Sequence, residues 1–190
     1  MVSEAVSKPP HGLDLVIDFV NTLDPDEHTD AFATPQGLGG WLAERRLLDT
    51  GVAPLGEVER RQAVRLREAL RALMLEHNGG ERDEGAAQEL ERVARHGELA
   101  VRFGAGGNAQ LAPGARGFAG ALAAVLVPVA DAAPDGTWLR VKACRAGDCQ
   151  WAFYDRSRNR SGVWCSMAVC GNRAKVRSYR SRRPSAAADA

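Results

Sequence analysis

The sequence predicts an α+β fold that is mainly helical: a helical N-terminal domain with a β-hairpin, followed by a small four-cysteine module that ends in a basic helix. Three observations support this prediction. Apolar residues recur at helical spacing through most of the first 132 residues. On both sides of a glycine-rich turn at residues 104–107, the apolar residues recur at every second position. All four cysteines of the 190-residue chain lie between residues 144 and 170.

The helices of the N-terminal domain are located by this periodicity and by residues that favour helix ends. Leu15, Phe19 and Leu23 recur every four residues and predict a helix over residues 13–23, although the β-branched residues beside them also allow a strand. Thr34, followed by a proline, is typical of a helix start. The further helices are expected at residues 34–48, 54–77, 83–96 and 114–132, the last bent near Pro128.

Strands are predicted where the apolar residues alternate. Residues 99–103 and 108–111 flank the glycine-rich turn, and their alternation predicts a β-hairpin. A phosphate-binding loop is the disfavoured alternative, because the turn lacks the lysine and Ser/Thr of such a loop. Residues 138–143 and 151–154 predict two strands beside the first cysteines. The expected organisation is a domain at 13–136, a four-cysteine module at 138–183, and flexible termini at 1–12 and 184–190.

The cysteines form two pairs, Cys144 with Cys149 and Cys165 with Cys170. Each pair has four intervening residues, and fifteen residues separate the pairs. Two loops that each supply two sulfurs are typical of a tetrahedral zinc site, which predicts Zn²⁺ as the cofactor. Two disulfides, an iron–sulfur centre and metal-free thiols are the alternatives. Four thiolates leave no coordination position for water, so we expect a structural metal.

Charge is distributed unevenly along the chain. Residues 140–183 contain twelve Lys/Arg and two acidic residues, a net charge of +10, whereas the residues before them carry a net −8. This layout is typical of a nucleic-acid-binding module on a separate domain. The candidate DNA-binding residues are one loop residue and five residues of the C-terminal helix: Arg158, Arg173, Lys175, Arg177, Arg180 and Arg182. The alternative is a solvated helix that neutralises the acidic domain.

The residues around the last cysteine resemble the CGNR zinc-finger family. The resemblance covers roughly residues 138–183 and rests on the four cysteines and on the tetrapeptide from Cys170 to Arg173. The run of residues 15–23 is similar to the ABATE domain that accompanies this finger. The resemblance implies four zinc ligands, a finger that binds DNA and an N-terminal domain that senses a signal in a regulator of stress-induced transcription. The sequence departs from the family pattern at Gly162 and Val163, because members of the family commonly have basic residues at these positions.

Local chemistry suggests roles for residues next to the metal. Arg173 is expected either to pair with Asp155 or to contact DNA. Asn172 is expected to cap the helix or to donate to a thiolate, and Cys170 to begin the basic helix. Val176 and Tyr179 lie between the basic edges of that helix and are expected to pack on the zinc core.

Polar residues beside the first apolar stripe suggest a ligand pocket. Asp18, Asn21 and Thr22 are its candidate lining, and the alternative is that they only tie neighbouring loops together. No catalytic constellation is present in the sequence, so we expect a protein that is not an enzyme. A catalytic N-terminal domain is kept as a further hypothesis.

Composition predicts the compartment. The mean hydropathy of −0.28 and the 26% of charged residues indicate a soluble chain. The longest apolar stretch, residues 118–130, is too short to span a bilayer, and Asp14 and Asp18 interrupt any signal peptide. We therefore expect a cytoplasmic protein without membrane contact.

The favoured function is a zinc-containing transcription regulator. Its finger would bind DNA through the basic helix, and its N-terminal domain would respond to a small ligand or a protein partner. A homodimer is also expected, because one short helix gives little sequence specificity. The alternative is a zinc-stabilised module for protein or RNA interaction, without sequence-specific DNA binding.

Overall fold

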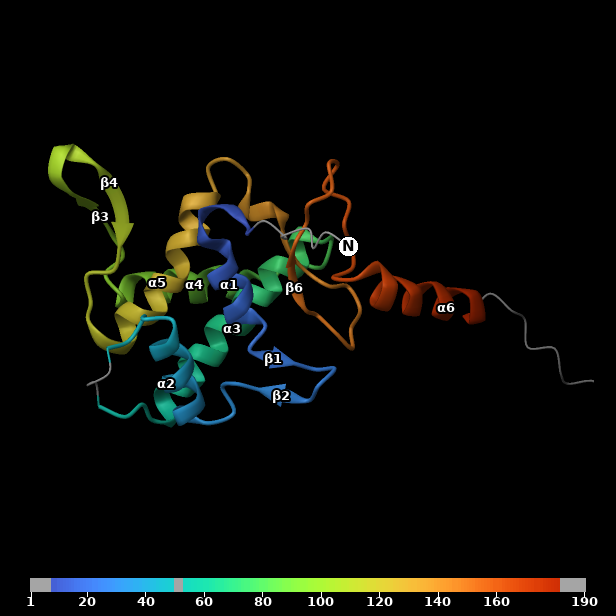
Figure 1. Ribbon diagram of the computed structural model, residues 1–190, viewed down its shortest axis with the longest axis horizontal. Helices are drawn as coiled ribbons and strands as arrows, with labels where there is room; N and C mark the ends of the chain where they lie inside the picture. The colour runs from blue at the N-terminus through green and yellow to red at the C-terminus, as the bar shows by residue number, and fades with distance from the viewer. Residues whose placement is uncertain (1–7, 50–52, 182–190) are drawn as a thin grey trace, which may run out of the picture.

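The computed structural model describes residues 8–49 and 53–181 and places a small cysteine module beside a helical domain (Figure 1). The α-helices are α1 (Leu13–Val20), α2 (Pro35–Glu44), α3 (Glu57–His77), α4 (Glu84–His96), α5 (Gly117–Ala132) and α6 (Asn172–Ser181). The strands are β1 (Leu23–Asp24), β2 (Thr29–Asp30), β3 (Ala100–Phe103), β4 (Ala109–Ala112), β5 (Val141–Ala143) and β6 (Ala152–Tyr154). This confirms the predicted mainly helical α+β class. Arg182, the tail at 184–190 and the first seven residues of the expected flexible lead-in lie outside the described residues.

Local sequence explains where these helices begin. The hydroxyl of Thr34 accepts a hydrogen bond from the backbone N–H of Gly37 at 3.1 Å and caps α2. The carboxylate of Asp83 accepts from the first turn of α4 in the same way. The first apolar stripe is a helix only as far as Val20, with Leu13, Val16 and Phe19 among its buried side chains. Leu23, which was expected to continue the stripe, lies in β1.

Aromatic contacts and α5 form the centre of the core. The rings of Phe19, Phe32 and Trp41 pack together with centroids 5.3–5.7 Å apart. The small-residue helix α5 packs against α1 and α4, and most of its middle turns are buried: Ala121, Leu122, Ala123, Val125 and Leu126 are at most 5% exposed. Within the described residues, no helix combines the length and apolar character needed to cross a bilayer.

The strands form three antiparallel pairs: β1 with β2, β3 with β4, and β5 with β6. The hairpin at β3–β4 was predicted, and it projects from one end of the molecule (Figure 1). The strand expected at residues 138–143 is confirmed only from Val141, because Trp138–Arg140 form a 3-10 turn. The preceding turn, in which Thr137 N donates to Asp135 Oδ1, leads Trp138 into the core, where its ring lies 5.1 Å from that of His77.

Buried arginines of α3 fix the base of the β1–β2 hairpin. Arg67 is 3% exposed, and its Nη atoms donate to both carboxylate oxygens of Asp30 at 2.6 and 3.1 Å. Arg71 donates to the carbonyl of Val20 at 2.7 Å, at the end of α1. The hairpin is therefore fixed at β2, while its turn extends toward the cysteine module (Figure 1).

The cysteine module is fastened to the end of α3. Val141, Ala143 and Ala152 from the β5–β6 hairpin belong to the main hydrophobic core. The Nδ2 group of Asn78, a buried residue, donates to the carbonyls of Ala143 and Val163, both at 2.8 Å. One amide thus joins the two loops of the module to the helical domain.

Replacing Asn78 with alanine tests this attachment. Asn78→Ala removes the side-chain donor of Ala143 O and leaves Val163 O with only the 3.4 Å contact from Arg145 N, so we expect the free energy of unfolding to fall by about 2 kcal/mol. Urea denaturation of the zinc-loaded protein measures the change. Asn108→Ala, on the exposed β3–β4 turn, is the control and should be neutral. Equal stabilities of the two variants would show that Asn78 is not a structural attachment.

Candidate metal centre and basic helix

Two turns bring the four cysteines together. Cys144 directly follows β5 and Cys149 precedes β6, so the β5–β6 turn supplies the first pair. The second pair, Cys165 and Cys170, encloses a tight turn in which Ser166 Oγ accepts from Val169 N at 3.3 Å. Local hydrogen bonds within each turn place its two sulfurs. The attachment to α3 through Asn78 fixes the position of one turn relative to the other.

The geometry of the sulfurs fits a tetrahedral metal. All four Sγ atoms lie within 4.8 Å of one another, and Cys165 Sγ is 3.7 Å from both Cys149 Sγ and Cys170 Sγ. A tetrahedron with Zn–S bonds of about 2.3 Å has sulfurs about 3.8 Å apart. Three of the cysteines are buried, and Cys165 is partly buried. The four residues therefore form a metal site of zinc-finger type.

Electrostatics also requires a cation at this site. Burial, with a smaller contribution from the charge of Cys144, raises the pKa of the Cys149 thiol to about 11. Burial and the neighbouring cysteines raise the pKa of Cys165 as well. Four thiolates can be buried together only beside a positive ion, and Zn²⁺ supplies that charge without redox chemistry.

The basic helix starts after the last ligand, not at it. Cys170 lies in a π turn at Met167–Gly171, and α6 begins at Asn172. The amide of Asn172 donates to the carbonyl of Ala168 at 3.0 Å, so it secures this turn instead of donating to a thiolate. Cys170 was expected at the start of the basic helix; it lies in the π turn that leads directly into α6, two residues before the helix begins.

A buried ion pair orders the loop between the cysteine pairs. Lys142 and Asp155 are 5% and 3% exposed, and Lys142 Nζ donates to Asp155 Oδ2 at 2.8 Å and to the carbonyls of Arg160 and Gly162. Burial raises the pKa of Asp155, but hydrogen bonds from Lys142 and Ser157 outweigh it and lower that pKa to about 2. The expected pairing of Arg173 with Asp155 is therefore wrong: Lys142 occupies that carboxylate.

The candidate DNA-binding residues fall into two groups. Arg173 pairs with Asp26 at 3.0 Å and lies 3.7 Å from Asp148, and Arg177 lies 3.3 Å from Asp148. The remaining described candidates are exposed and have no ion pair within residues 8–49 and 53–181: Arg158, Lys175 and Arg180. Arg182 lies outside the described residues.

Two apolar residues of α6 do not pack as expected. Val176 is 48% exposed and Tyr179 is 60% exposed, and neither belongs to the core around the cysteines. Trp151 and Trp164 cover that core instead. The reason is the direction of α6, which extends away from the body immediately after Gly171 (Figure 1).

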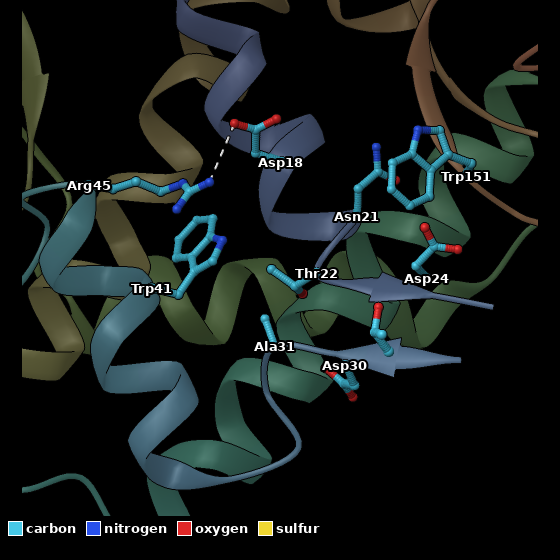
Figure 2. A pocket seen from close by; sticks show the side chains of 10 residues that line it. Asp18, Asn21, Thr22, Asp24, Asp30, Ala31, Trp41, Arg45 and Trp151 are labelled. Carbon is cyan, nitrogen blue, oxygen red and sulfur yellow. Dashed lines mark ion pairs between the residues drawn. The ribbon is translucent and has the colours of Figure 1, made fainter. Parts of the chain in front are cut away.

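The candidate pocket residues line an open cleft of about 580 Å³ between α1, α2 and the β1–β2 hairpin (Figure 2). Asp18 lies 3.6 Å from Arg45, whose guanidinium lies 3.9 Å from the centre of the Trp41 ring. Asn21 is fully engaged, since its amide exchanges hydrogen bonds with the backbone of Ala152 at 2.9 and 2.7 Å.

Thr22 is also engaged, because it donates to the carbonyl of Phe19 at 2.8 Å. The structural role considered for these residues therefore describes Asn21 and Thr22. Asp18 lines the cleft, and its carboxylate pairs with Arg45 (Figure 2).

Sequence reasoning missed the other walls of this cleft. Trp41, Arg45 and Trp151 come from distant segments, and no local spacing links them to α1. It also missed Asp26 and Asp148 as partners of the arginines. An Asp-rich turn at residues 24–27 was the available signal, but nothing in the sequence places it beside α6.

These features define a helical domain that carries a zinc finger. The family profile of the CGNR zinc finger matches residues 140–183. The profile of the ABATE family, described as "Putative stress-induced transcription regulator", matches residues 13–136, which is more than half of the chain. The chain therefore belongs to the ABATE family, and both resemblances are confirmed. No curated protein matches the chain.

Zinc content tests the metal centre. We expect one zinc ion per chain by elemental analysis, and Cys170→Ser should lower the content strongly because the site loses one of its four thiolates. Arg158→Ala, in the neighbouring loop, is the control and should keep the metal. A Cys170→Ser variant with full zinc, or an iron-dependent visible spectrum of the wild-type protein, would contradict the assignment.

The buried ion pair provides a second test. Asp155→Asn leaves the Lys142 ammonium buried without its counter-ion, so we expect the free energy of unfolding to fall by about 3 kcal/mol. Asp131→Asn makes the same charge change at an exposed position of α5 and should be neutral. Thermal unfolding of zinc-loaded samples compares them. If Asp155→Asn left the melting temperature unchanged, the Lys142–Asp155 pair would not stabilise the fold.

Proposed function

We propose that the protein is a DNA-binding transcription regulator whose zinc finger presents α6 to duplex DNA. One observation carries the proposal: a metal-anchored helix with several exposed cations projects from a domain of opposite net charge (Figure 1). Cations clustered on one exposed helix are the usual electrostatic footprint of phosphate binding.

The surface of α6 has the composition that groove binding needs. Val169 and Val176 line a shallow groove of about 540 Å³, which is bordered by Arg173, Arg177 and Arg180. Arginines suit phosphate oxygens and guanine edges, while small apolar side chains can contact thymine methyl groups. Zinc is proposed to act without catalysis, since four thiolates close its coordination shell and hold the turn that precedes α6.

Ligand sensing is proposed for the cleft at Asp18. A cleft lined by two tryptophans and several carboxylates provides apolar area and polar groups for orienting a small molecule. Its far wall is Trp151, which lies between the last cysteine of the first pair and β6. A ligand in the cleft would therefore contact both the N-terminal domain and the zinc module. We also propose that the protein is not an enzyme.

Exposed apolar residues of the finger favour a second candidate. Met167, Val169, Val176 and Tyr179 are 47–60% exposed, which also suits docking to a protein. The alternative function is thus a zinc-stabilised module for protein or RNA interaction, and the same surface could join two copies of the chain.

A salt titration of DNA affinity tests the main proposal. We expect the zinc-loaded protein to bind duplex DNA with a steep salt dependence and a measurable sequence preference. Lys175→Ala and Arg180→Ala should each weaken binding and reduce the salt slope by about one, because each removes one phosphate contact. Fluorescence anisotropy over a range of salt concentrations measures both quantities.

The control carries the same charge change on the other domain. Arg95→Ala, at an exposed position of α4, should leave affinity and slope unchanged. Stronger binding to RNA than to duplex DNA would favour the alternative function. Absence of DNA binding near physiological salt would overturn the proposal.

A further inference from the structure

The turn of the β1–β2 hairpin lies between the helical domain and the basic helix. Its sequence, Asp24-Pro25-Asp26-Glu27, contains three acidic residues, and Asp24 Oδ1 accepts from the backbone N–H groups of Asp26 and Glu27 at 3.0 and 3.2 Å. This local bonding fixes the turn, and the carboxylate of Asp26 reaches the first turn of α6.

Asp26 holds Arg173 in the way that a phosphate would. The Nη atoms of Arg173 donate to both oxygens of Asp26, at 3.3 and 3.0 Å. Two parallel hydrogen bonds to two oxygens are the arrangement by which arginine also recognises phosphate. An Arg173 that is engaged by Asp26 cannot make the same contact with DNA.

The two carboxylates that face α6 differ in origin. Asp148 belongs to the β5–β6 turn, between Cys144 and Cys149, and therefore moves with the finger. Asp26 belongs to the N-terminal domain. Among the ion pairs of the described residues, the Arg173–Asp26 pair is the one that joins the basic helix to that domain.

We propose that the acidic β1–β2 turn is an intramolecular competitor of DNA, which occupies Arg173 until DNA or a change in the hairpin releases it. This inference rests on the proposed function and concerns the regulation of the same helix. The contact is weak enough to open, because Arg173 and Asp26 are 38% and 47% exposed and exposed pairs contribute little stability.

The surroundings of the turn also permit opening. A cleft of about 260 Å³ separates residues 24–27 from the cysteines. The cluster of buried and partly buried residues around the metal includes none of the turn residues. The turn at residues 24–27 can thus move away from α6 while Arg67 keeps the base of the hairpin fixed at Asp30.

The same hairpin forms a wall of the ligand cleft. Asp24, Thr29 and Asp30 line the cleft, and Trp151 lines both this cleft and the smaller one beside the cysteines. A molecule bound at Asp18 would therefore contact the element that carries Asp26. This gives ligand binding a physical route to the availability of Arg173.

Removing the Asp26 charge tests the proposal. We expect Asp26→Asn to bind duplex DNA about two- to fivefold more tightly than wild type, with a salt slope steeper by about one. Glu27→Gln is the matched control: it makes the same charge change one residue away, on a side chain without an ion pair to α6 in the described residues. Zinc content and circular dichroism confirm that both variants are folded.

A second background separates release of Arg173 from a general loss of repulsion. In Arg173→Gln protein, Asp26→Asn should change DNA affinity no more than Glu27→Gln does. Equal gains from Asp26→Asn and Glu27→Gln in the wild-type background would overturn the inference and leave the proposed function intact. Failure of every variant to bind duplex DNA would overturn both.

Discussion

The structure of the finger depends on one constraint: four adjacent thiolates, three of them buried, repel one another and require a cation among them. Satisfying that constraint brings the β5–β6 turn and the Cys165–Cys170 turn to a common point, with all four sulfurs within 4.8 Å. The segment after Cys170 then has a fixed starting direction. The metal thus determines where α6 points, and it does so for a module whose own apolar cluster is too small to hold it.

The finger and the helical domain are also firmly joined and are not two separate modules. Residues of β5 and β6 contribute to the main core, and Asn78 binds both loops of the finger. A rigid joint at this end contrasts with the exposed ion pair at Asp26. The combination of one rigid and one weak contact allows the availability of a side chain to change while the orientation of the helix does not.

Much of this could be predicted from the sequence, because the signals are local. Cysteine spacing predicted the metal ligands, and apolar period and caps such as Thr34 predicted the helices. The errors concern partners that are distant in sequence. Pairing with Asp155 was one of two roles expected for Arg173, but Lys142 occupies that carboxylate. Tyr179 was expected to pack on the metal core, but it is exposed on α6. The charge pattern of the sequence shows which segments are acidic or basic, but it does not show which of them lie side by side. The position of Asp26 beside α6 could therefore be found only from the fold.

In the regulator that we propose, the metal positions α6 for contact with DNA. Hydrogen–deuterium exchange of the zinc-loaded protein, with and without a bound duplex, tests it most directly because it locates the contact on the chain. We expect slower exchange over residues 166–181, with faster exchange over residues 24–27 as the acidic turn is displaced. Protection confined to the helical domain, or no change over residues 166–181 at saturating DNA, would contradict it.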